Sequence, residues 1–543
     1  FDLRPTWQGR GVQVGVAFVL AGLAAVLIAH LLARSTGLPS AVLLVAAGGI
    51  YALLPGPNLT LDPQVILVVV LPPLLFAAAL NSSLVALRGD AATIGGLSVG
   101  LVLVTAVAVG LVLHAAVPAV PLAVAIALGA AIAPPDPVAA LSVGRRSGLP
   151  ARLITLVEGE GLLNDAVALT MLKVAVAAAV GEGFSLGGAL LKFLLTAAGG
   201  AAIGLVVALA LAQGRRLLAD SLLENALSLA TPFAAYLAAE ELHVSGVLSV
   251  VIAGLWLGHR GPTVSSDSRL QTRPVWRLVE FLLEGFVFLL IGQQLPTVVR
   301  GLDAYPTHTV VAAAAVSVLL VLVLRPTWLL LTVALPYWLR ARAGRRPSRQ
   351  PLTVRDLMAL SWAGTRGVIT LAAAFSLPLT LGGRDFPSRD LLLFCAYLVV
   401  VVTLVGQGLT FGPLVRRLRF PNAELENALL RNQARLAAIE ASLARLDELV
   451  EAGEQPAETV AVLRRVTEIR RKRYADRVAL LSAVEDDVLP QDGRREASVR
   501  LRRAMIDAER ESLLEWRDSG RLPDASLRVL QRELDHEESL LPR

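Results

Sequence analysis

Long apolar stretches alternate with short polar connections over most of the chain. A helix needs about 20 consecutive apolar residues to cross a bilayer, and thirteen stretches approach that length. They begin near residues 11, 38, 64, 92, 118, 151, 185, 221, 244, 275, 307, 355 and 390. The pattern predicts an all-α polytopic membrane protein with thirteen transmembrane helices.

Residues 421–543 have a different pattern. Apolar positions recur there at helical spacing, with charged residues between them, as in an amphipathic helix. The apolar positions of the first part are Leu429, Leu430, Ala434, Leu436, Ile439, Leu443 and Leu446. We therefore expect a transmembrane domain over 1–420 and a cytoplasmic helical tail, structural or regulatory, over 421–543.

Composition and charge support this division. The chain is 55% hydrophobic and only 17% charged, against about 25% charged in an average soluble domain. The net charge of +6 does not indicate a nucleic-acid partner, because the basic residues gather in short connections such as "GRRSGLPAR" at 144–152 and "LRARAGRRPSRQ" at 339–350. The positive-inside rule then predicts an odd number of helices in the cell (inner) membrane, with the N-terminus outside and the C-terminus in the cytoplasm.

The sixth apolar stretch contains the polar sequence "EGEGLLNDAVALT" at 158–170. An ionisable side chain at mid-membrane costs about 2.5–3.5 kcal/mol on insertion scales, so such a residue is a candidate for function. Asp165 lies near the centre of the stretch, beside Asn164. Glu158 lies two helical turns earlier on the face of Asp165, toward the cytoplasmic approach, and Glu160 shares a face with Asn164.

Two other stretches contain sequences that a straight helix cannot accommodate. In the fifth, "AIAPPDPVAA" at 131–140, three prolines surround Asp136 and remove backbone donors. In the twelfth, "SWAGTRGVITLAAAF" at 361–375, two glycines flank Thr365 and Arg366. Both sequences predict a broken helix, whose free backbone groups must be buried in protein or line a polar cavity.

The positions of these two breaks suggest an internal repeat. The fifth and twelfth stretches are seven apart, so stretches 1–6 and 8–13 would be two repeats of opposite orientation. Interrupted helices at matching positions of two halves are the best sequence indication of a transporter's binding site.

Taken together and in this order, "APPDPVAA", "EGEG" followed by "LLND", and "SWAGTRGVITLAAA" resemble the monovalent cation/proton antiporters. The resemblance is to their sodium/proton exchanger branch (the NhaP and NHE type), and to bacterial members with a cytoplasmic helical tail. It covers about residues 1–415 and implies two inverted six-helix repeats with crossing unwound helices. It also implies a core of helices at about 92–181 and 307–415, a dimerisation or scaffold part at about 11–87 and 185–296, a homodimer and alternating access.

The resemblance also implies roles for individual residues. Asp165 corresponds to the aspartate that binds the cation and the proton, and Asn164 to the amide that marks the electroneutral branch. Asp136 corresponds to the aspartate of the broken-helix motif. Glu160 and Arg366 correspond to an ion pair that ties the sixth helix to the twelfth.

Three positions depart from the family pattern. Pro135 stands where a hydroxyl residue usually precedes Asp-Pro, Gly161 stands where a serine is usual, and "AAAL" at 77–80 has no carboxylate. These departures leave the ion preference open. Glu158, Thr365 and Glu284, the last in the tenth stretch, are further candidates for the ion pathway.

We therefore expect a secondary transporter, not an enzyme, that needs no cofactor and exchanges Na⁺ or Li⁺ for H⁺. With Asn164 in place of a second carboxylate, one cation would trade for one proton at Asp165. K⁺/H⁺ antiport by the same fold is the nearest alternative, followed by a passive cation channel. An intramembrane hydrolase using Asp136 and Asp165 is disfavoured because the sequence has no "GxGD"-like motif. A membrane sensor is disfavoured because the tail has no recognisable motif.

Overall fold

The structure is a computed structural model of the chain. It describes residues 6–54, 65–180, 186–217, 220–260, 266–342, 352–381, 384–420, 423–453, 456–483, 493–539 and 541. Two compact units are present, Phe1–Phe420 and Pro421–Arg543.

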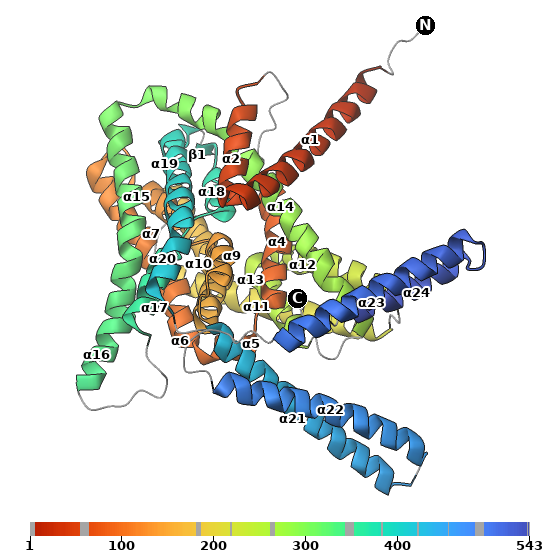
Figure 1. Ribbon diagram of the computed structural model, residues 1–543. Coiled ribbons are helices and arrows are strands. Elements are labelled where there is room, and N and C mark those ends of the chain that lie inside the picture. Colours follow the sequence, from red (N-terminus) through yellow and green to blue (C-terminus); the bar gives the residue numbers. More distant parts are fainter. Residues whose placement is uncertain are drawn as a thin grey trace. The chain divides into compact units, whose positions relative to one another are not determined.

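The first unit is a bundle of helices (Figure 1). Its first half contains α1 (Thr6–Thr36), α2 (Ser40–Tyr51), α4 (Leu71–Asn81), α5 (Leu84–Gly89), α6 (Ala91–Gly95), α7 (Val102–Ala116), α8 (Leu122–Ile132), α9 (Pro137–Arg146) and α10 (Ala151–Ala179). Its second half contains α11 (Leu186–Leu217), α12 (Ser221–Glu241), α13 (Gly246–His259), α14 (Ser266–Arg300), α15 (Thr307–Leu329), α16 (Leu335–Arg342), α17 (Val354–Trp362), α18 (Val368–Phe375), α19 (Arg389–Val402) and α20 (Gly408–Leu418).

Short irregular elements complete this unit. Among the described residues, four π-helical segments adjoin α-helices, namely η1 (Ile66–Val70), η2 (Gly96–Leu101), η5 (Leu330–Ala334) and η6 (Thr403–Gln407). A 3₁₀ turn, η4 (Gly301–Ala304), follows α14. Strands β1 (Thr380–Leu381) and β2 (Arg384–Asp385) pair antiparallel, with Thr380 opposite Asp385.

The predicted all-helical membrane protein with several apolar spans is confirmed. By length and composition, six helices within the described residues could cross a membrane, and four shorter helices are also apolar. Twelve of the thirteen predicted starting points lie within about five residues of a helix start. The exception is α14, which begins at Ser266 rather than near residue 275, because the polar sequence "SDSRLQTR" continues the helix. The predicted connection at 339–350 lies partly outside the described residues.

Both predicted helix breaks are present. The fifth apolar stretch divides into α8 and α9, with residues 133–136 between them, and the twelfth divides into α17 and α18, with residues 363–367 between them. Pro137 occupies the first turn of α9, where its missing N–H is no loss, and Asp136 is the N-cap. Local backbone chemistry therefore sets the place of the fifth break.

The broken helices lie within the apolar core of the unit. The consecutive residues Ala127–Ile132 of α8 are all buried, so the helix is surrounded on every side. Buried side chains of α18 and α19 belong to the same core cluster. The polar groups at the end of α8 are consequently held in an apolar environment, where each needs a partner.

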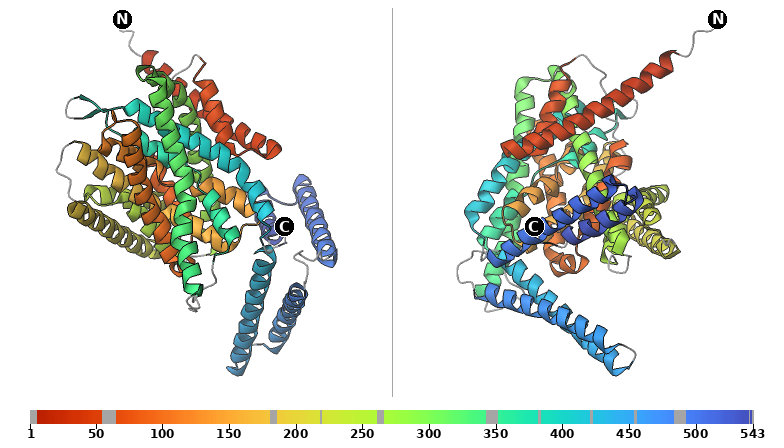
Figure 2. Two further views of the ribbon diagram at one scale, coloured as in Figure 1. Left: turned by 90° about the vertical axis from the view of Figure 1, so that its left-hand side faces the viewer. Right: turned by 45° about the vertical axis from the view of Figure 1, so that its right-hand side comes forward.

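One long helical rod runs along a side of the first unit. Helices α15 and α16 follow one another through η5, as both Figure 1 and Figure 2 show. Arg325 lies on this rod and is buried. The rod thereby places the positively charged Arg325 side chain, from the eleventh apolar stretch, near the breaks.

The second unit consists of helical pairs. Helix α21 (Ala423–Glu451) packs against α22 (Ala457–Ser482), and α23 (Gly493–Asp518) packs against α24 (Asp524–Ser539). Ile439, Leu443 and Leu481 are buried in this unit. Ion pairs also join the partner helices, among them Arg464 with Asp447 and Arg510 with Asp535.

Candidate functional site

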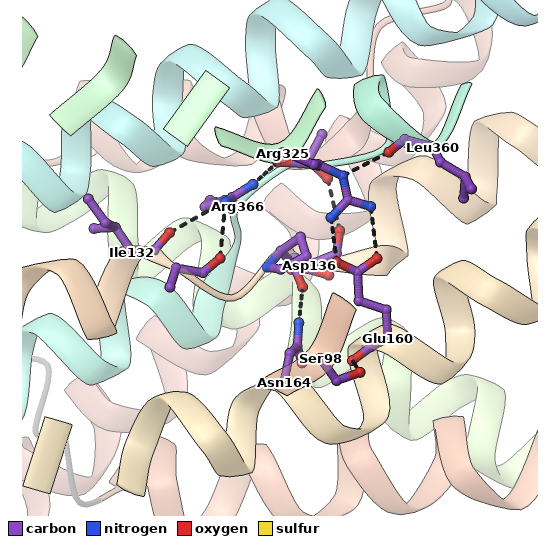
Figure 3. A network of polar contacts seen from close by, with 12 residues as sticks. Ser98, Ile132, Asp136, Glu160, Asn164, Arg325, Leu360 and Arg366 are labelled. Carbon is purple, nitrogen blue, oxygen red and sulfur yellow. Dashed lines mark hydrogen bonds and ion pairs between the residues drawn. The ribbon is translucent and has the colours of Figure 1, made fainter. Parts of the chain in front are cut away.

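The two helix breaks cross and bond to each other. The Asp136 backbone N–H donates to the Thr365 carbonyl at 2.7 Å, and the Thr365 hydroxyl donates to the Asp136 carbonyl at 2.9 Å. The Arg366 guanidinium donates to the carbonyls of Ile132 and Ala133, both at 3.0 Å (Figure 3). The carbonyls that α8 leaves free are thus satisfied by the other break, as buried backbone requires.

Asp136 lies at the centre of this crossing. Its Oδ1 accepts the Val138 N–H at 3.0 Å and so caps α9. Its Oδ2 faces Gly367, where an added Cβ would lie only 1.7 Å from that oxygen. A glycine is therefore required at position 367 for the carboxylate to reach the break.

Helix α10 places Asn164 and Asp165 beside the crossing. Asn164 is 0% exposed, and its Nδ2 donates to the Pro135 carbonyl at 2.8 Å. The buried Asn164 Oδ1 has no hydrogen-bond partner among the described residues. Asp165 is 3% exposed and lies close enough to Asp136 for the two carboxylates to interact electrostatically.

Glu160 forms an ion pair, but its partner differs from the prediction. Arg325 of α15 binds Glu160 through two N–H···O contacts, Nη1 to Oε1 and Nη2 to Oε2, the latter at 2.8 Å (Figure 3). Arg325 also donates from Nε to the Leu360 carbonyl at 2.7 Å. Glu160 is 1% exposed and Arg325 is 2% exposed, so the pair is buried.

The predicted pairing of Glu160 with Arg366 is therefore corrected. Besides the two carbonyls of the other break, Arg366 donates from Nη1 to the Gly364 carbonyl, and its backbone N–H donates to the Thr403 hydroxyl at 2.9 Å. Backbone carbonyls are thus the partners of the Arg366 guanidinium, in place of the predicted Glu160 carboxylate. Arg325 was overlooked, although it is the only charged residue between 307 and 339 and meets the criterion that selected Asp165.

The position that lacks the family's serine is tightly packed. A Cβ added at Gly161 would lie 2.5 Å from Cγ of Pro137, the first residue of α9. Gly161 therefore allows α10 to approach the crossing closely. This contact gives a packing reason for the glycine beside the broken helix.

A cavity of about 650 Å³ reaches the crossing from one side. Asp136, Thr365 and Glu284 of α14 line it, and both carboxyl side chains are half-buried. Arg34, Ser147 and Arg416 also line the cavity. Glu158 is half-buried on α10 and is not among the lining residues of this cavity.

The site combines acids in two different states. The Glu160 carboxylate is neutralised by Arg325, whereas no lysine or arginine among the described residues forms an ion pair with Asp165. Asp165 and the Asn164 Oδ1 thus offer oxygen atoms that the protein leaves available. Oxygen atoms are the ligands that hard cations prefer, and a buried carboxylate also gains from taking up a proton.

Sequence comparisons identify one family. A family described as "Sodium/hydrogen exchanger, transmembrane" matches residues 22–417. An uncharacterised Na⁺/H⁺ exchanger of Mycobacterium tuberculosis (strain H37Rv) is 33% identical, with 98% of each chain covered. YjcE of Escherichia coli, also named as an uncharacterised Na⁺/H⁺ exchanger, is 30% identical over 90% of this chain and 91% of its own.

A solved structure has a similar fold. The sodium proton antiporter MjNhaP1 of Methanocaldococcus jannaschii matches with a TM-score of 0.59, covering 75% of this chain and 99% of its own. The two sequences are 17% identical, so this likeness concerns the fold alone.

Proposed function

Because the chain belongs to the sodium/hydrogen exchanger family, we propose that this multi-pass membrane protein exchanges Na⁺ or Li⁺ for H⁺ at Asp165. The observation that carries the proposal is a buried carboxylate without an ion-pair partner among the described residues, next to an amide oxygen that is also without a partner and beside two crossing helix breaks. The exchange takes place across the cell membrane and trades one cation for one proton.

Competition for one carboxylate explains the coupling. A bare negative charge on buried Asp165 is costly, so the carboxylate takes up either a proton or a cation. Both occupants neutralise the site, and only the neutralised site crosses the membrane barrier. Asn164 provides an oxygen ligand but no second titrating group. One proton is therefore exchanged for each cation, and the cycle moves no net charge.

The buried arginines hold the site without taking part in exchange. Arg325 neutralises Glu160 and ties α10 to α15 and to the end of α17. Arg366 binds the free carbonyls of α8 and thereby fixes the crossing. Removal of either guanidinium is expected to disturb the position of the Asp136 and Asp165 carboxylates.

We place the cavity at the cytoplasmic side. Arg34, Ser147 and Arg416 line it, and all three belong to connections that the positive-inside rule assigns to the cytoplasm. Glu284 faces the same cavity as Asp136. Its carboxylate attracts cations into the cavity, with Thr365 on the path to Asp165.

Exchange requires the site to face each side in turn. We propose thirteen membrane helices in two inverted repeats, a core at about 92–181 and 307–415, a scaffold at about 11–87 and 185–296, and a homodimer with its N-terminus outside. The equivalent places of the two breaks in the chain and the fold likeness to MjNhaP1 support this arrangement. The core then carries Asp165 past the scaffold.

Potassium is the second candidate ion. A relative from Bacillus pumilus, named a sodium, potassium, lithium and rubidium/H⁺ antiporter, is 33% identical over 68% of this chain and 56% of its own. The absence of hydroxyl side chains at Pro135 and Gly161 also leaves a looser set of ligands. This observation favours a broader ion range over strict sodium selectivity.

Proteoliposomes containing a pH-sensitive dye test the proposal. Na⁺, Li⁺ and K⁺ are added in turn to vesicles with an imposed pH gradient, and each transported ion dissipates the gradient. Sodium flux that persists without proton movement would instead identify a passive channel. A rate that depends strongly on membrane voltage would refute the one-for-one exchange.

A further inference from the structure

Helix α22 of the tail exposes an apolar stripe. Val462, Val466 and Ile469 recur at intervals of four and three residues and so share one helical face. Their side chains are 58%, 52% and 55% exposed. Leu480 continues the same face and is 41% exposed. This stripe is not the side of α22 that faces α21.

Other residues of α22 make the contacts with α21. Arg464 forms an ion pair with Asp447 of α21, and the Arg435 guanidinium of α21 lies over the Tyr474 ring, 5.5 Å from its centroid. At about 100° per residue, Arg464 lies about 160° from Val466 around the helix axis, and Tyr474 lies about 140° from Ile469. The pairing of the two helices therefore leaves the stripe exposed.

Basic residues predominate around the stripe. Exposed basic residues lie on both sides of it and along it, namely Arg465, Arg470, Lys472 and Arg473. In all, α22 contains seven basic and three acidic residues, whereas α21 contains three basic and six acidic residues. The basic character thus belongs to the helix that carries the exposed stripe.

We propose that α22 docks on the anionic lipid surface of the bilayer. A helix with an apolar face bordered by Arg and Lys binds in the interface plane, with the apolar side chains at the boundary of headgroups and acyl chains. The tail follows α20 directly in the sequence, so α22 is tethered to the membrane domain. Tethering raises the effective concentration of the bilayer surface for α22.

Charge argues against a second copy of α22 as the occupant. Two α22 helices packed through their stripes would bring their arginines and lysines together, and like charges across an interface are strongly unfavourable. Anionic headgroups have the opposite sign. Each basic residue near an anionic surface strengthens binding by about fivefold, and four of them by several hundred-fold.

A single fluorescent label can report docking in the full-length protein. Cys395 is the only cysteine and is buried, so Val466→Cys provides one reactive site for an environment-sensitive dye. The labelled protein is placed in nanodiscs of phosphatidylcholine, with or without phosphatidylglycerol. We expect a blue-shifted emission, quenched by brominated lipid, only with the anionic lipid, and its loss as salt screens the charges.

Two sets of substitutions separate charge from general effects. The docking variant combines Arg465→Gln, Arg470→Gln, Lys472→Gln and Arg473→Gln, which preserve helix propensity and should lower the docked-to-free ratio several hundred-fold. The control variant removes four exposed charges from α23 and α24 by Arg500→Gln, Arg503→Gln, Arg528→Gln and Arg532→Gln. The control should retain the blue shift.

Two results would overturn the proposal. One is the same emission in neutral and anionic nanodiscs. The other is energy transfer between labelled α22 helices of two copies that persists in neutral lipid, which would identify helix pairing instead. Neither result depends on ion exchange, so the docking proposal and the proposed function stand or fall separately.

Discussion

Removing Arg325 should destabilise the protein by leaving the Glu160 carboxylate charged and unpaired inside the bundle. Both side chains are at most 2% exposed, and they share two N–H···O contacts. Loss of one partner from a buried pair costs about 3–5 kcal/mol. Loss of the Arg325 bond to the Leu360 carbonyl adds about 0.5–1.5 kcal/mol. Arg325→Met keeps most of the side-chain volume, so these electrostatic costs should dominate.

A double-mutant cycle isolates the pair. The double variant Glu160→Gln with Arg325→Met retains neither charge. Its loss in the free energy of unfolding should therefore be smaller than the sum of the losses of the two single variants, by about 1–3 kcal/mol. Unfolding of the purified protein by sodium dodecyl sulfate, followed by circular dichroism, measures each free energy. The matched cycle combines Glu160→Gln with Arg366→Met, and there we expect weaker coupling, because Arg366 donates to carbonyls and interacts with Glu160 electrostatically without a direct ion pair.

The second cycle makes the reasoning refutable. Strong coupling of Glu160 to Arg366 together with none to Arg325 would reverse the pairing seen in the structure. A loss below about 1 kcal/mol for Arg325→Met would contradict the cost expected for an unpaired buried charge.

Three other outcomes follow from the site. Asp165→Asn should retain the folded yield in size-exclusion chromatography and abolish dye-detected exchange, and normal exchange would refute the carrier role of Asp165. Gly367→Ala should lower the folded yield, because its Cβ would lie 1.7 Å from Asp136 Oδ2. The control Gly95→Ala, whose Cβ would have nothing within 4 Å, should not lower it. Equal yields of the two variants would disprove the close contact. Glu284→Gln should raise the KM for Na⁺ about tenfold, the factor for roughly 1.4 kcal/mol of lost attraction, with little change in kcat; an unchanged KM would exclude a role in cation entry.

The sequence by itself determined the local features of this protein. Apolar run lengths placed the helices, because a bilayer demands about 20 apolar residues for each crossing. Prolines around Asp136 and glycines around Arg366 placed the two breaks, since they act on the backbone of their own neighbours. The position of Asp165 within an apolar run also marked it as a candidate, because the cost of burying a charge there follows from the apolar residues around it in the sequence.

Only the tertiary structure decided which of these residues meet. Glu160 and Arg325 are 165 positions apart, and Arg366 reaches carbonyls more than 230 positions away. The contact of Gly161 with Pro137, the partnerless oxygen of Asn164 and the cavity shared by Asp136 and Glu284 are likewise products of packing. Two arginines of equal charge were available to one glutamate, and packing brought Arg325 to its carboxylate and Arg366 to the carbonyls of the other break.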